Sequence, residues 1–238
     1  MQAAAVDTLL ARLRAIASDT VALLAGHPVT RAWLDGTLDR ERSFALQAQV
    51  YHQVAQTVPL LQRSAATCAA WAADEPMYAA LAAHYREHAH EESQPAPHDQ
   101  LLLERLRRQG FPVDRMPRPF PPLQEALERA WWAAEHTPLY ELGRAWVKEV
   151  VSQYMSGRAT RAAAGAGPEG AGEAGDFYAV HATADPGHSA ENARILRELS
   201  AYPLFAAKAP EVLAGATDAY EQTRRSLAYL EGLARPSQ

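Results

Sequence analysis

Apolar residues recur every three to four positions along almost the whole chain, and alternating runs of Val, Ile or Thr are absent. The three-to-four spacing places apolar side chains on one face of an α-helix, whereas a strand needs a spacing of two. We therefore predict an all-α protein whose helices are joined by short breaks. Because the 238 residues contain no internal repeat, we expect one domain over residues 1–238.

Proline and glycine mark the expected helix boundaries. Residues 161–175 are almost only Ala and Gly, so we predict a flexible loop there. We predict helices over 3–24, 39–71 with a candidate kink at Pro59, from Pro76 to the prolines at 95 and 97, from His98 to Gln109, through 131–135, and over 138–156, 175–181, 186–199 and 210–233.

Composition narrows the function classes. The formal net charge of -5 is spread without a long run of one sign, so we expect no nucleic-acid partner. No stretch of eighteen apolar residues occurs, so we expect no membrane segment. Cys68 is the only cysteine, which excludes an internal disulfide and suits a reducing compartment. We expect a cytoplasmic protein, and symmetry statistics favour a homodimer.

The segment from Phe177 to His188 carries the sharpest local motif. His181, Asp185 and His188 are spaced by four and three residues, which places their side chains on one face of a helix. Imidazole nitrogen together with carboxylate oxygen suits Fe(II), Mn(II) or Zn(II). The alternative interpretation is that Asp185 caps a helix opened by Pro186, with both histidines at the surface.

A second candidate motif flanks the proline break after residue 94. Glu91, Glu92 and His98 occur there, and His88 precedes them by one helical turn. Ligands on both sides of a broken helix would give adjustable coordination. A solvated charged face is the alternative interpretation of the same residues.

Glu149 is the third candidate ligand. Leu142, Trp146 and Glu149 fall near one face of the helix that begins at Pro138, so the carboxylate occurs where apolar side chains are expected to be buried. A buried carboxylate needs a cation or a hydrogen-bond donor. Surface placement beside Lys148 is the alternative. Several helices that each contribute a carboxylate or a histidine are the way helical bundles build metal centres.

At these residues the sequence resembles the heme-oxygenase-like di-iron oxidases and oxygenases, in the superfamily of the TenA thiaminases and the pyrroloquinoline quinone synthase. The resemblance covers most of the chain, from Gly26-His27-Pro28 to the last helix. The central pattern of that family, Glu-Glu followed by His-Asp, is echoed at residues 91–92 and 98–99. Its Pro-Leu…Leu-Gly helix, which ends in a ligand glutamate, is echoed at residues 138–149, and its His-x3-Asp-x2-His motif at residues 181–188.

The resemblance implies a heme-oxygenase-like bundle of about seven to nine helices. It also implies non-heme iron, one or two ions with manganese as an alternative, and O2-dependent oxidation of a small organic acid or amine. The ligands it assigns are Glu92, His98, Glu149, His181, Asp185 and His188.

One departure from the family leaves the number of metals open. Members with two irons usually add a glutamate from the long early helix, but this chain has no acidic residue between Glu41 and Asp74. Further candidates for the metal or the pocket are Glu91, His88, His52 and Tyr51, and for the early helix also Gln49, Gln53 and Gln56.

Three other functions compete with the oxidase. A TenA-like thiamin-salvage hydrolase needs a nucleophilic cysteine, and Cys68 is the one candidate. A heme oxygenase needs an early axial histidine, for which His27 is a candidate. A metal-free helical binding protein of the same fold is the third alternative, which the missing early carboxylate favours.

Overall fold

Helices account for most of the residues that the computed structural model describes, which are 2–94, 96–165 and 176–233. No strand occurs among these residues. In chain order the elements are α1 (Gln2–Gly26), α2 (Pro28–Leu34), α3 (Arg40–Val54), α4 (Thr57–Trp71), α5 (Met77–Glu91), α6 (His98–Arg108), the 3-10 helix η1 (Val113–Arg115), α7 (Pro121–Trp132), α8 (Pro138–Gly165), α9 (Phe177–Leu199) and α10 (Pro203–Leu233).

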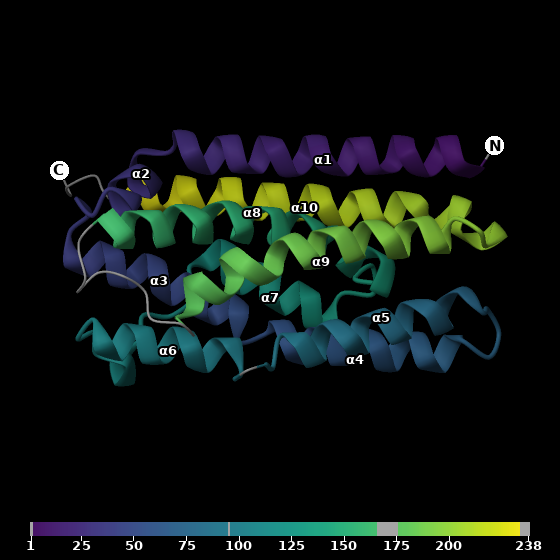
Figure 1. The fold of residues 1–238 in the computed structure, drawn as a ribbon, viewed down its shortest axis with the longest axis horizontal. Coiled ribbons are helices and arrows are strands. Elements are labelled where there is room, and N and C mark those ends of the chain that lie inside the picture. The colour runs from purple at the N-terminus through teal and green to yellow at the C-terminus, as the bar shows by residue number, and fades with distance from the viewer. Residues whose placement is uncertain (1, 95, 166–175, 234–238) are drawn as a thin grey trace.

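The predicted all-α class is confirmed. The predicted number was about seven to nine helices. Besides the seven-residue α2, nine α-helices occur in the described part of the chain. Helices α1, α8 and α10 lie together in one part of the bundle, while α4 and α5 form an antiparallel pair on the other side (Figure 1). Helix α9 packs against α8 and also contacts α5 and α6. None of the described helices combines the length and the apolar character that a membrane span requires.

The predicted helix over residues 39–71 is two helices, and the break falls at Ala55 and Gln56 instead of at Pro59. Pro59 lies in the first turn of α4, where a proline is tolerated because the backbone N–H groups of a first turn have no partner within the helix. Asp39 caps α3 as the sequence predicts, since its side chain accepts a hydrogen bond from the backbone of Arg42 at 2.9 Å.

Two predicted helix starts, Pro186 and Pro210, lie inside continuous helices. Each proline removes one backbone hydrogen bond, and the packing of the residues on both sides of it offsets that loss. The predicted loop at 161–175 is also partly wrong, because residues 161–165 continue α8. Alanine has the highest helix propensity, which favours this extension. Residues 166–175 lie outside the described part of the chain.

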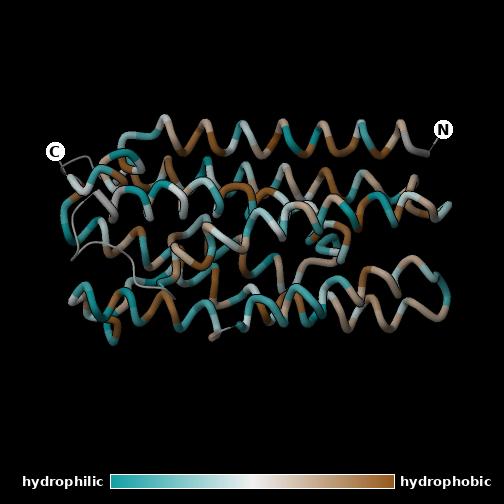
Figure 2. Tube along the Cα trace, viewed as in Figure 1, coloured by the Kyte–Doolittle hydropathy of each residue, from teal (hydrophilic) through white to brown (hydrophobic). Residues whose placement is uncertain are grey.

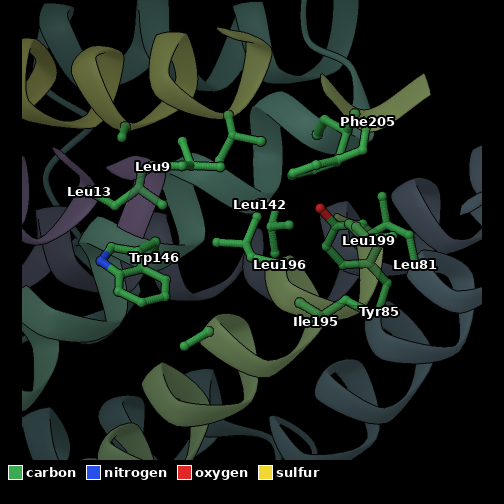
Figure 3. Close-up of a cluster of buried hydrophobic side chains, with 14 of the residues drawn as sticks. Leu9, Leu13, Leu81, Tyr85, Leu142, Trp146, Ile195, Leu196, Leu199 and Phe205 are labelled. Carbon is green, nitrogen blue, oxygen red and sulfur yellow. The ribbon is translucent and has the colours of Figure 1, made fainter. Parts of the chain in front are cut away.

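The main core forms where α1, α5, α8 and α9 meet. Apolar residues recur along one side of α1 (Figure 2), and Leu9, Leu10 and Leu13 are buried there. Figure 3 shows leucines of α1 facing Leu142 of α8, with side chains of α9 and α5 completing the cluster. Tyr85 of α5 donates a hydrogen bond to the backbone carbonyl of Pro138, where α8 begins. This core fixes the three helices that carry most of the polar residues described below.

A glycine contact brings α8 and α10 unusually close together. A Cβ atom on Gly143 would lie 1.8 Å from the backbone oxygen of Val212, and one on Gly215 would lie 1.8 Å from the backbone oxygen of Tyr140. Neither backbone can yield without moving its whole helix, so only glycine fits at these two positions. The contact therefore fixes the position of α8 along α10.

Candidate metal centre

A stripe of polar residues runs along α5 toward its end. His84, His88 and Glu92 are spaced by four residues, so they lie on one face, and all three are buried. Glu92 is the C-terminal cap residue of α5, and the chain turns from it into α6. His98, the first residue of α6, is also buried.

A matching stripe runs along α9, where His181, Asp185, His188 and Asn192 are all buried. Because α9 passes through Pro186 without a break, the spacings of four, three and four residues keep these side chains on one face. Asp185 lies inside the helix, so it does not cap a helix opened by Pro186. The alternative of a surface cluster is wrong for these residues.

The two stripes meet in pairs. His84 of α5 and Asn192 of α9 are joined by a hydrogen bond of 2.9 Å from Nε2 to Oδ1. One turn away, the rings of His88 and His188 lie 4.5 Å apart between their centroids. His84 belongs to the sequence motif around Glu91 and Glu92, two turns before them, whereas Asn192 was missed, although it lies four residues after the candidate ligand His188. This pair fixes the register of α5 against α9.

The first group of candidate ligands is His88, Glu92, Glu149 and His188, whose ligand atoms all lie within 4.8 Å of one another. Nε2 of His88 lies 3.4 Å from Oε1 of Glu149 and 3.7 Å from Oε1 of Glu92. Nδ1 of His188 lies 3.3 Å from Oε2 of Glu149. Glu149 is therefore buried among imidazoles, and the alternative interpretation of a surface position beside Lys148 is wrong.

The second group is Glu92, His98 and His181, which meet the same distance limit. Nδ1 of His98 lies 2.9 Å from Oε2 of Glu92, whereas Oε1 of Glu92 faces the first group. Glu92 thus belongs to both groups through different oxygens. Of the two neighbouring glutamates, Glu92 belongs to both candidate groups and Glu91 to neither.

Outer hydrogen bonds fix the orientation of two rings, and a third ring has an outer contact with a carboxylate. His98 donates from Nε2 to the carbonyl of Gln94 at 3.1 Å, and His181 donates from Nδ1 to the carbonyl of Phe177 at 2.9 Å. The remaining nitrogen of His98 faces Glu92, and that of His181 is left for the second group. Nε2 of His188 lies 3.2 Å from Oε2 of Glu91. Histidines that bind metals typically donate their second N–H to a carbonyl or carboxylate in this way.

Asp185 is fully buried and belongs to neither group as the side chains stand. Neither of its oxygens has a hydrogen-bond partner of good geometry, although the nearby Ser152 hydroxyl lowers its pKa somewhat. Burial, followed by the negative charge of Glu149, raises the pKa of Asp185 to about 9. A buried carboxylate without a donor needs either a proton or a cation.

The charges of the two groups likewise require protons or cations. Burial favours the neutral form of His88, but the carboxylates of Glu149 and Glu92 outweigh it and raise its pKa to about 10. Burial likewise opposes ionisation of Glu149, yet the two imidazoles of the first group lower its pKa to about 2. Protons on His88 and Asp185 thus compensate the carboxylates. Divalent cations would supply the same positive charge and would also satisfy the unpartnered atoms of both residues.

Other residues named by the sequence lie away from both groups. His52 is bound through Nε2 to the carbonyl of Pro117 at 2.7 Å, and Tyr51 packs in a separate apolar cluster of α3 and α6. Gln56 accepts a hydrogen bond from Trp131, and Gln49 bonds to the backbone near Phe120. The candidate roles of Tyr51 and His52 as ligands are therefore not supported by their positions.

A cavity of about 260 Å³ borders the centre. His88, Glu92, Glu149 and His181 form part of its wall, and most of the remaining wall is apolar, contributed by α3, α4, α7, α8 and α10. The wall also includes Lys148. Its sequence context suggests a solvated side chain, but Lys148 is half-buried. Burial, followed by the charge of Arg144, lowers the pKa of Lys148 to about 8.

Fold and site together define an all-α protein with two buried histidine and glutamate groups that could bind metal. Comparison with family models, with curated proteins and with solved structures finds no match for this chain. The functional assignment therefore depends on the geometry of the site and on the sequence motifs.

Proposed function

We propose that this protein binds two non-heme iron ions and catalyses an O2-dependent oxidation of a small organic substrate. The observation that carries the proposal is the position of Glu92, whose two oxygens face two separate groups of buried imidazoles. A carboxylate shared in this way is suited to bridging two cations.

The chemistry of the ligands favours borderline divalent metals. Each group combines imidazole nitrogen with carboxylate oxygen, which suits iron, manganese and zinc, and neither group contains a thiolate. The resemblance to the di-iron oxidases selects iron, and manganese fits the same ligands. Bound iron would supply the activation of O2 that protein side chains cannot provide.

The residues of this chain would then perform three tasks. The carboxylates of Glu92, Glu149 and Asp185 would balance the charge of the cations, and the outer hydrogen bonds would hold the imidazoles in place. Protons now held by His88 and Asp185 would leave as the cations bind. The mostly apolar cavity would hold the substrate beside the centre and exclude water.

The competing enzymes fit the structure less well. Cys68 is fully buried, burial raises its pKa to about 12, and it does not line the cavity, so it is unsuited to nucleophilic attack. His27 caps α2 and lies 3.1 Å from Glu231, outside the cavity wall. Neither the TenA-like hydrolase nor a heme protein is supported by these positions.

Metal loading under anaerobic conditions tests the proposal. We expect chelator-treated protein to bind two Fe(II) per chain and Glu92→Gln to lose most of both, because one residue serves both groups. His90→Ala is the matched control, since His90 is exposed on the same helix and should keep full binding. Admitting O2 to the loaded protein should consume it in proportion to bound iron. Protein that takes up no iron at micromolar concentration would overturn the proposal in favour of a metal-free binding protein.

A further inference from the structure

Lys148 differs from the other basic residues of the chain in both sequence and structure. Lys148 and Lys208 are the only lysines in the sequence, and all other fixed cations are arginines. Lys208 lies on α10 and forms an ion pair of 2.7 Å with Glu211. Lys148 lines the cavity and forms no ion pair within 4 Å among the described residues.

The short-range contacts of the carboxylates near Lys148 are with other residues. Glu141 lies 2.6 Å from His136, and Asp218 contacts Arg129 of α7 and lies 3.8 Å from Arg144 of α8. Glu149 lies among the imidazoles of the first group. Among the described residues, Lys148 is therefore left without an ion-pair partner in the cavity wall.

The position of Lys148 relates this unpaired amino group to the centre. Lys148 is adjacent in sequence to Glu149, and Ser152, one turn further on, lines the same cavity and interacts with Asp185. Residues one turn apart on a helix have Cβ atoms about 5–6 Å apart. An anion bound to Lys148 would consequently be held beside the metal groups.

The cavity limits what can carry that anion. Its volume of about 260 Å³ is slightly below the usual range for small-molecule sites. Its wall follows α8 from Glu141 to Ser156, which at 1.5 Å per residue is a length of about 22 Å. Most of the wall is apolar, although Glu141 and glutamines of α3 line it besides the metal groups and Lys148. A narrow organic molecule with an apolar body and one acidic end fits this chemistry.

We propose that Lys148 binds the carboxylate of the substrate, so that the protein selects organic acids with an apolar body over amines and neutral compounds. This inference deepens the proposed function by choosing the acidic class and naming the residue that recognises it. Lysine forms a strong hydrogen bond to a carboxylate when both are shielded from water.

Calorimetric binding of hexanoate, with 1-hexanol as the uncharged probe of the same length, tests the proposal. We expect hexanoate to bind at least about tenfold more tightly than hexanol, and Lys148→Gln to abolish that preference. Lys148→Arg should retain the preference, and Lys208→Gln is the matched control that should not change it. Equal hexanoate affinity in Lys148→Gln and the unsubstituted protein would overturn the proposal, as would the absence of hexanoate binding at millimolar concentration.

The measurements are made on both chelator-treated and anaerobic Fe(II)-loaded protein, which separates this inference from the function on which it rests. Binding that depends on Lys148 in protein that takes up no iron would support the acid site and overturn the oxidase. Binding that requires iron and ignores Lys148 would place the carboxylate on the metal and overturn the inference. Acetylation of the unsubstituted protein provides a check that needs no variant: hexanoate should protect Lys148 and leave Lys208 reactive.

Discussion

Two buried polar regions lie along α8, and they compensate their charges differently. In the charge cluster of Glu141, His136, Arg144 and Asp218, each carboxylate has a cationic or imidazole partner, such as His136 at 2.6 Å from Glu141. Two turns along the same helix, Glu149 shares its imidazoles with Glu92, and Asp185 has no partner of good geometry.

The difference distinguishes structural charges from a site prepared for a ligand. Buried charges that hold a fold together are paired within the protein, because an unpaired one is costly. The two candidate groups instead contain Glu92 and Glu149, whose ion pairs are all with imidazoles, and Asp185 beside them has no partner of good geometry. The requirement of the centre for positive charge can be met from outside the chain, whereas that of the charge cluster is met within it.

The largest effect should come from breaking the support that both regions share. Gly143→Ala places a methyl group against the backbone of Val212, so α8 must move away from α10. We expect a loss of more than about 3 kcal/mol in the free energy of unfolding, together with loss of metal binding. Urea denaturation measures it. Gly157→Ala on the same helix is the control, since only the flexible Arg161 is near, and equal stability of the two variants would contradict the explanation.

Removing one carboxylate from each region should have different effects on stability and on iron binding. In metal-free protein, Glu141→Gln breaks a buried pair and should cost about 3 kcal/mol. Glu149→Gln should cost less, about 1–2 kcal/mol, because relief of repulsion with Glu92 offsets part of the lost imidazole contacts. Iron binding should respond in the opposite way and fall only for Glu149→Gln. A large stability loss in both variants would mean that the centre is itself a structural charge network.

The pH dependence of the charge cluster follows from Glu141. Burial opposes its ionisation, but the hydrogen bond from His136 and the charges of Arg144 and Lys148 lower its pKa from 4.5 to about 2. A lowered folded pKa stabilises the protein above the unfolded value and stops doing so as the pH falls through the folded value. The stability advantage over Glu141→Gln should therefore shrink as the pH falls from 4.5 to about 2. Denaturation of both proteins across this range measures the difference, and a constant advantage would contradict the assignment.

The smallest effect should come from the outer contact of the centre. Glu91 is 45% exposed and lies 3.2 Å from Nε2 of His188, so it positions that ring without reaching the first group. We expect Glu91→Gln to weaken Fe(II) binding about tenfold and to leave stability unchanged. Glu87→Gln, an exposed glutamate one turn earlier, should leave both quantities unchanged. A loss of iron as complete as in Glu92→Gln would instead make Glu91 a ligand.

Local periodicity was sufficient to predict the fold class and most helices, because the apolar spacing of a helix is written in consecutive residues. It failed at Pro59, Pro186 and Pro210, where the tolerance of a helix for proline depends on its position in the helix and on tertiary packing. Trp132 of α7 is 83% exposed, which its type does not predict, since a large aromatic side chain is mostly buried on average. A single aromatic residue carries no periodic signal.

The candidate site was predictable where its residues are close in sequence. The spacing of His181, Asp185 and His188 indicates one helix face, and α9 places them there. The sharing of Glu92 between two groups and the contact of Glu91 with His188 depend on the turn between α5 and α6 and on the packing of α9, which spacing does not encode. Whether Lys148 lines the cavity depends on how α8 is rotated about its axis. The one available signal in the sequence was the scarcity of lysine, which occurs at only two positions.

The register of α9 has a consequence for how this sequence can vary in length. Four buried polar positions lie on one face of that helix over about three turns, and His188 and Asn192 meet α5, where the bond between His84 and Asn192 closes the row beyond the centre. A single inserted residue after Pro186 would rotate everything beyond it by about 100°. His188 and Asn192 would then turn away from α5 together. Insertions and deletions should therefore be excluded from this part of α9 even where its exposed side chains vary freely.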